Sequence, residues 1–183
     1  DPAAVGNTRE ILISELAGKA AVQSRADLDD EAAARVIERV KDLEHRGFHF
    51  EAADGSLDLL IRRETGEHEP LFRLESWRVI AEKREDGTVQ TEATIKIWAD
   101  GRRYVRTAEG NGPVHALDRA LRSALSELHP HLADIRLVNY KVRILDEWKA
   151  TGATTRVLLD ASDGTDTWGA IGVHENVIEA SWD

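Results

Sequence analysis

The sequence predicts an α+β fold in which two βββα units follow a small helical subdomain. Two observations carry this prediction. After Pro70 the spacing of apolar residues changes from every third or fourth residue, typical of helices, to every second residue, typical of strands. The order of three strands and a helix, with Asp-Gly turns between strands, then occurs twice, in residues 71–128 and 135–183.

The helical subdomain begins with an amphipathic stretch. Asp29 or Asp30 can cap its N-terminus, and Gly47 stands where a left-handed C-cap is expected. Between them, apolar residues recur at helical spacing: Ala33, Val36, Ile37, Val40 and Leu43. A second helix is predicted to start near Asp54. The polar segment 64–70, which contains a glycine and a proline, is predicted to be a linker.

The first βββα unit is predicted from alternation and turns. Strands are expected near 77–82, 89–97 and 102–108, and a helix over 113–128 carries Val114, Leu117, Leu121, Ala124, Leu125 and Leu128 on one face. Open antiparallel sheets with helices on one face leave edges and apolar surface to cover. A homodimer is therefore expected.

The second unit repeats this order with little sequence identity. Strands are predicted over 136–145, 154–160 and 167–173, followed by the start of a helix at 175–181. Strict alternation places Val138, Tyr140, Val142 and Ile144 on one side of the first of these strands. On residues alone, Tyr140 is either a core tyrosine or the wall of a pocket. A weaker strand is predicted at residues 10–13.

Composition excludes several classes of function. The 183 residues carry 24 Lys+Arg against 34 Asp+Glu, a net charge of -10, which argues against nucleic acid and anionic membranes as partners. Cysteine is absent, so disulfides and thiolate chemistry are excluded. With no apolar run of about 20 residues and no signal peptide, a cytoplasmic protein is expected. The chain starts at Asp1 and has no methionine, so a piece of a longer polypeptide is expected.

One turn could hold a ligand. Gly110-Asn-Gly-Pro113 opens the 113–128 helix, with Asn111 or Gly112 as its cap and Pro113 in its first turn. It lacks the Lys-Ser/Thr ending of a phosphate loop and the spaced glycines of a dinucleotide site. It is therefore either a plain strand-to-helix turn or a site where free N–H groups receive a carboxylate. His129 and His131 have no third ligand at metal spacing, and no catalytic or metal-binding constellation is predicted.

These residues resemble a known family. The segments Glu109-Gly-Asn-Gly-Pro-Val114, Leu137-Val-Asn-Tyr140 and Gly172-Val-His-Glu-Asn-Val-Ile-Glu-Ala-Ser181 resemble the regulatory domain of 2-isopropylmalate and citramalate synthases. Leu43-Glu-His-Arg-Gly47 is similar to their helical linker subdomain, particularly in the citramalate synthase branch. The resemblance then divides the chain into the end of a linker (1–22), the helical linker subdomain (23–66) and the regulatory domain (67–183).

The resemblance implies a regulatory role rather than an enzyme. The parent protein would condense acetyl-CoA with a 2-oxo acid on a catalytic barrel that carries a divalent metal and precedes residue 1. No cofactor would bind to the present residues themselves. The regulatory domain would form a homodimer, contact its own catalytic barrel, and bind leucine or isoleucine as the pathway's end product. Two alternatives are that the domain only dimerises the synthase, having lost effector binding, or that the chain is itself an enzyme.

The resemblance also supplies candidate effector-binding residues: Asn111, Gly112, Val114, Leu137, Tyr140, Ile144 and Val177. The helix start would take the carboxylate, and the branched residues would bury the ligand's side chain. Asn139 stands where many relatives carry an acid, which leaves recognition of the ammonium group open. A bulky residue at Gly112 is expected to close the site and to strain the turn.

Overall fold

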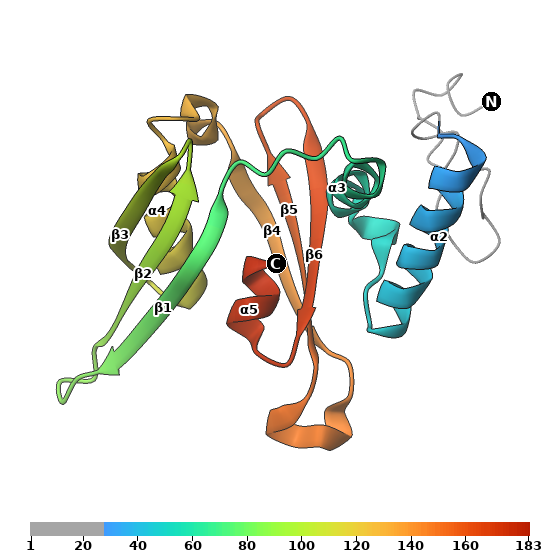
Figure 1. The fold of residues 1–183 in the computed structure, drawn as a ribbon. Coiled ribbons are helices and arrows are strands. Elements are labelled where there is room, and N and C mark those ends of the chain that lie inside the picture. The colour runs from blue at the N-terminus through green and yellow to red at the C-terminus, as the bar shows by residue number, and fades with distance from the viewer. Residues whose placement is uncertain (1–27) are drawn as a thin grey trace.

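The computed structural model describes residues 28–183, so the strand predicted at 10–13 and the linker end at 1–22 lie outside it. Two helices, α2 (Asp30–His45) and α3 (Asp54–Thr65), precede two three-stranded antiparallel sheets. Figure 1 shows the two sheets side by side, with the C-terminal helix between them and α3 beyond the second sheet. The predicted α+β class with two βββα units is confirmed.

The ends of α2 and α3 follow from their flanking residues. Asp29 Oδ1 accepts a hydrogen bond from the Ala32 amide at 2.8 Å and caps α2. Gly47 adopts a φ of 101° two residues after α2 ends, which turns the chain into the short 3-10 helix η2 (Phe50–Ala52). Gly66, with φ 76°, ends α3 in the left-handed conformation.

The first unit has strand order β1-β2-β3, from β1 (Arg73–Lys83), β2 (Val89–Ala99) and β3 (Arg102–Gly110). Helix α4 (Pro113–Leu125) packs on β3 and β2 and starts at the proline, as predicted, although it ends three residues early. The core between helix and sheet consists mainly of small and branched residues: Ala93, Ile95, Ile97, Ala99, Ala116, Leu117, Ala120, Ala124 and Leu125.

The second unit has strand order β4-β5-β6, from β4 (Arg136–Ile144), β5 (Thr155–Ser162) and β6 (Thr167–His174). A 3-10 helix, η3 (Pro130–Ala133), precedes it, and another, η4 (Glu147–Gly152), joins β4 to β5. Helix α5 (Val177–Trp182) follows β6 and packs back on β6 and β5.

The two units share a β-bulge at the same place in their first strand. In β1 the register shifts between Leu74 and Ser76, and in β4 between Leu137 and Asn139. The extra residue of β4 is Val138. The prediction that Val138 continues the alternation of Tyr140, Val142 and Ile144 is therefore wrong, because a bulge inserts one residue and resets which side chains face the core.

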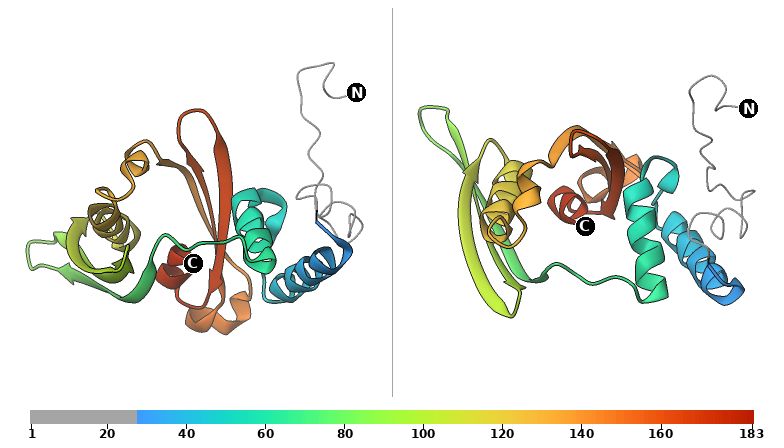
Figure 2. Two further views of the ribbon diagram at one scale, coloured as in Figure 1. Left: turned by 45° about the horizontal axis from the view of Figure 1, so that its top comes forward. Right: turned by 90° about the horizontal axis from the view of Figure 1, so that it is seen from above.

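Helices α2 and α3, called the linker helices from here on, pack on the second unit, although the chain joins them to the first. Ile171 and Val173 of β6 belong to the same hydrophobic core as residues of α2 and α3. Ile178 and Trp182 of α5 pack instead against the core of the first unit. Seen from above, α4 and α5 lie between the two sheets, and α3 and α2 lie outside the second sheet (Figure 2).

Candidate functional site

The turn that opens α4 depends on one of its two glycines. A Cβ on Gly110 would lie 2.4 Å from the Ala116 backbone nitrogen, so only glycine lets β3 pass this close to the helix. Gly112 has a φ of -172°, an extended conformation open to any residue, and a Cβ there would meet nothing within 4 Å. The expectation that a side chain at Gly112 strains the turn is therefore wrong.

This turn leaves the start of α4 open. Gly112 is the cap residue and has no side chain, so no side-chain hydrogen bond caps the helix, and Pro113 follows it. The Asn111 amide donates to His115 Nδ1 at 3.2 Å, which folds the loop back on the first turn. Asn111 itself is exposed, and Gly112 and Val114 are half-buried. First-turn N–H groups of a helix have no partner within the helix, so they are available to an anion.

Three of the predicted residues form a row along β4. Leu137, Tyr140 and Ile144 pair with Ala161, Leu159 and Thr155, which alternate along β5 and therefore share one face. The bulge is what brings Leu137 and Tyr140, three residues apart, to the same face. All three are at least 36% exposed. The row spans roughly 20 Å along the strand, more than the length of one branched-chain amino acid.

Tyr140 and Val177 are joined through a serine that sequence reasoning missed. The Ser181 hydroxyl donates to the Val177 carbonyl oxygen at 2.6 Å, which commits its single proton. The Tyr140 hydroxyl lies 2.7 Å from Ser181 Oγ, so Tyr140 is the donor of that bond and keeps only acceptor lone pairs for a ligand. The signal for Ser181 was its position four residues after Val177, on the same helix face.

The predicted residues thus form two groups. Asn111, Gly112 and Val114 lie in one turn, and Tyr140 and Val177 meet through Ser181. Within residues 28–183, no hydrogen bond or ion pair joins the α4 turn to β4. Asn139, the residue before Tyr140, points away from this face: its Nδ2 donates to Asp160 Oδ2 at 2.7 Å.

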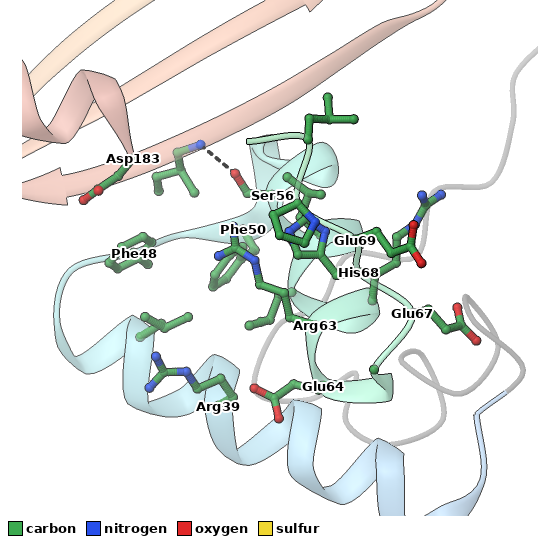
Figure 3. Close-up of a pocket in the computed structure, with 18 of the residues that line it drawn as sticks. Arg39, Phe48, Phe50, Ser56, Arg63, Glu64, Glu67, His68, Glu69 and Asp183 are labelled. Carbon is green, nitrogen blue, oxygen red and sulfur yellow. Dashed lines mark hydrogen bonds between the residues drawn. The ribbon is translucent and has the colours of Figure 1, made fainter. Parts of the chain in front are cut away.

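A cleft of about 1100 Å³ lies at a different place, between the linker helices, the segment 66–72 and the end of α5. Figure 3 shows Asp183 and Phe48 at one end of its lining, Phe50, Ser56 and Arg63 in the middle, and Glu67 at the other end. Its charged lining has both signs, and none of the seven predicted effector residues lines it. Burial raises the pKa of the Asp183 carboxyl, and the neighbouring Glu179 charge raises it further.

The part of the chain that is described offers no metal centre: residues 28–183 hold no group of three His, Asp or Glu side chains that could bind a metal ion. His129 and His131 contact each other edge to face, with ring centroids 5.7 Å apart. No helix in this range is long and apolar enough to cross a membrane.

The comparison with known proteins agrees with this architecture. The family described as the LeuA allosteric (dimerisation) domain matches residues 51–183, which include α3 and both βββα units. The chain belongs to this family. The matched residues thus include α3 as well as the two sheets.

Curated relatives are synthases. The chain is 53% identical over its full length to an (R)-citramalate synthase of Streptomyces coelicolor, and 43% identical to one of Aquifex aeolicus. A 2-isopropylmalate synthase of Methylorubrum populi is 32% identical over 88% of the chain. The chain spans 36% of the length of the two citramalate synthases and 30% of the third relative.

Proposed function

We propose that this chain is the amino-acid-sensing and dimerisation region of a citramalate synthase, with leucine or isoleucine as its effector. The observation that carries the proposal is the similarity of this whole chain to a part of (R)-citramalate synthases, combined with a family that is described as allosteric and dimerising. We assign the condensation of acetyl-CoA with a 2-oxo acid, and its divalent metal, to another part of the polypeptide, because this chain spans only 36% of the length of the citramalate synthases that it resembles.

The open start of α4 suits the effector's carboxylate. The two helices that follow the third strands differ here, since Asn176 Oδ1 accepts from the Ile178 amide at 2.9 Å and caps α5, whereas Gly112 leaves α4 uncapped. The uncapped helix keeps its N-terminal partial positive charge for a ligand. The branched side chain would lie against the half-buried Val114 and the exposed Ile144 and Val177.

Tyr140 suits the effector's ammonium group. Its proton is engaged by Ser181, so its oxygen accepts hydrogen bonds from a ligand and donates none. An ammonium donates three hydrogen bonds and accepts none, and this complementarity would replace the acid that Asn139 does not provide. Tyr140→Phe should weaken isoleucine binding about tenfold, the usual effect of losing a hydrogen bond to a charged group. Equal affinity in this variant would contradict the assignment.

Calorimetry with leucine and isoleucine tests the site. Gly112→Val should lower the affinity at least about tenfold, because the side chain fills the space beside the helix start. Gly152→Val is the matched control, since a Cβ there also meets nothing within 4 Å. It should bind and melt like the original protein. If Gly112→Val binds with unchanged affinity, the effector lies elsewhere.

A structural role alone is the second candidate. Leu137, Val142 and Ile144 are between 45% and 56% exposed on β4, and such a row favours burial against a second copy. Light scattering that shows a dimer, with no heat of binding from either amino acid, would favour dimerisation without sensing. A monomer at micromolar concentration would contradict the dimerisation proposal.

A further inference from the structure

Strand β6 is held along its outer edge by side chains of α3. Asp54 carries the carboxylate oxygen that accepts a hydrogen bond from the Gly169 amide at 2.6 Å. Ser56 Oγ accepts from the Ile171 amide at 3.0 Å. Both amides point away from β5 and would otherwise be unpaired, so the linker helix takes the place of a fourth strand.

The same strand lies close to the backbone of neighbouring elements at two glycines. A Cβ on Gly169 would lie 2.2 Å from the Ala52 carbonyl oxygen, just before α3. A Cβ on Gly172 would lie 2.0 Å from the Ala180 carbonyl oxygen of α5. Side chains at an interface can change rotamer and absorb a shift, but two backbones in direct contact cannot. A displacement of α5 is therefore passed on to β6.

A shared core reinforces this connection to the linker. Ile171 and Val173 of β6 pack with Val36 and Leu57 of the linker helices. Arg156 of the neighbouring strand donates from Nε to the Gly47 carbonyl oxygen at 2.6 Å, after the end of α2. The linker helices and the second sheet are thus one packed body.

Helix α5 also contacts the first unit. Trp77 Nε1 donates to Glu179 Oε2 at 3.0 Å, and the ring of Trp182 meets that of Phe72 edge to face at 6.3 Å. Trp182 and Phe72 both line the cleft beside the linker helices.

We propose that α5, β6 and α3 form a coupling path. Through this path, a change of conformation in the loop before α5 is transmitted to the linker helices. The inference rests on the proposed function, because Val177 at the start of α5 is a candidate effector contact. The path runs through the second unit, although the peptide chain connects the linker to the first unit. Release of the edge hydrogen bonds should uncouple α3 from α5 and leave the effector residues in place.

The first test needs no ligand and uses hydrogen exchange of the α3 amides. Asn176→Ala removes the cap of α5 and should speed exchange in α3 about fivefold, the factor that corresponds to a lost N-cap. Asp86→Ala is the matched control, because Asp86 Oδ1 accepts a hydrogen bond from the Thr88 amide at 2.9 Å in the turn between β1 and β2, and it should leave α3 unchanged. Equal effects of the two variants on α3, or no effect of Asn176→Ala, would overturn the path.

The second test adds isoleucine and a double variant, Asp54→Ala with Ser56→Ala. This variant removes the two hydrogen bonds from α3 to β6, which we call the clamp. In the original protein, isoleucine should slow exchange in β6 and α3. In the double variant the calorimetric affinity should stay within about threefold, while the change in α3 disappears. Thr107→Ala, which removes only a hydrogen bond to Thr94 on the first sheet, should keep the response in α3.

The two tests separate the possible failures. Absence of an isoleucine isotherm in the original protein contradicts the proposed function, and the ligand-free comparison still decides on the path. An α3 response that persists in the double variant overturns the path while the binding site stands.

Discussion

The two βββα units use the same backbone plan and differ in how they treat the helix that follows. In the first unit α4 has 13 residues, starts at an uncapped glycine and buries its apolar face in its own sheet. In the second unit α5 has six residues, is capped by Asn176 and packs against both units. The first unit thus has an uncapped helix start and the second a capped one. This difference is the reason why we propose ligand binding at the first helix and coupling through the second.

Pairing across the strands shows which residues correspond. Because both bulges fall at the same step, Trp77 in β1 occupies the position of Tyr140 in β4, opposite Ile95 and Leu159 respectively. Both bond to α5, Trp77 through Glu179 and Tyr140 through Ser181. Equivalent positions in the two units therefore hold one helix from two sides.

The largest expected effect contrasts Gly172 with Ala108, its counterpart in the first unit. Gly172→Ala places a Cβ 2.0 Å from the Ala180 carbonyl oxygen and should lower the free energy of unfolding by about 3 kcal/mol. Ala108→Gly should cost only about 1 kcal/mol. Urea denaturation measures both variants. A mild effect at Gly172 would mean that α5 lifts easily from β6.

A smaller contrast lies within the α4 turn. Gly110→Ala should lower the free energy of unfolding by about 2 kcal/mol, because the new methyl group meets the Ala116 backbone. Gly112→Ala should cost less than about 1 kcal/mol, since only the quality of the cap changes. Thermal melting of the two variants side by side checks the order. The reverse order would contradict the assignment of the tight contact to Gly110.

The third contrast concerns the two hydrogen bonds to α5. Trp77→Phe removes a half-buried bond to Glu179 and should cost about 1 kcal/mol of unfolding free energy in addition to any loss of packing. Tyr140→Phe removes a more exposed bond and should cost less, about 0.5 kcal/mol. Chemical denaturation tests this, and a larger loss at Tyr140 would show that α5 depends mainly on its own unit.

The smallest effect concerns the bulge residues, Glu75 in β1 and Val138 in β4. Hydrogen bonds from Arg103, with a further one from Trp98, lower the pKa of Glu75 from 4.5 to about 2. A lowered carboxyl pKa gives stability that is present above pH 4.5 and is lost as the pH falls towards 2. Melting of Glu75→Gln should therefore depend less on pH in this window. An unchanged pH dependence would contradict the pairing.

Sequence periodicity was sufficient for most of the fold. The predicted strand at 89–97 and helix start at Pro113 agree with β2 and α4, because alternation and proline placement are local signals. The bulge at Val138 was missed, since one inserted residue leaves no mark in the apolar pattern. The packing of the linker helices on β6 was also missed, because proximity along the chain favours β1.

The candidate site was less accessible to sequence reasoning. The need for glycine at Gly110 follows from a strand passing next to a helix, which the Gly-Asn-Gly-Pro pattern suggested without distinguishing the two glycines. Leu137 and Tyr140 came from the family resemblance, and only the bulge explains how they share a face. Ser181 makes Tyr140 the hydrogen-bond donor because its own proton goes to the Val177 carbonyl oxygen. This role depends on contacts in three dimensions that the sequence does not contain.

The clamp of α3 on β6 also limits how the second sheet can grow. With the Gly169 and Ile171 amides occupied by Asp54 and Ser56, another strand can be added to this sheet only along β4. If two copies paired through their β4 strands, each would cover the other's remaining free sheet edge. The joined sheet would then end at six strands. An endless fibre through this sheet needs two open edges, and the linker helix has removed one of them.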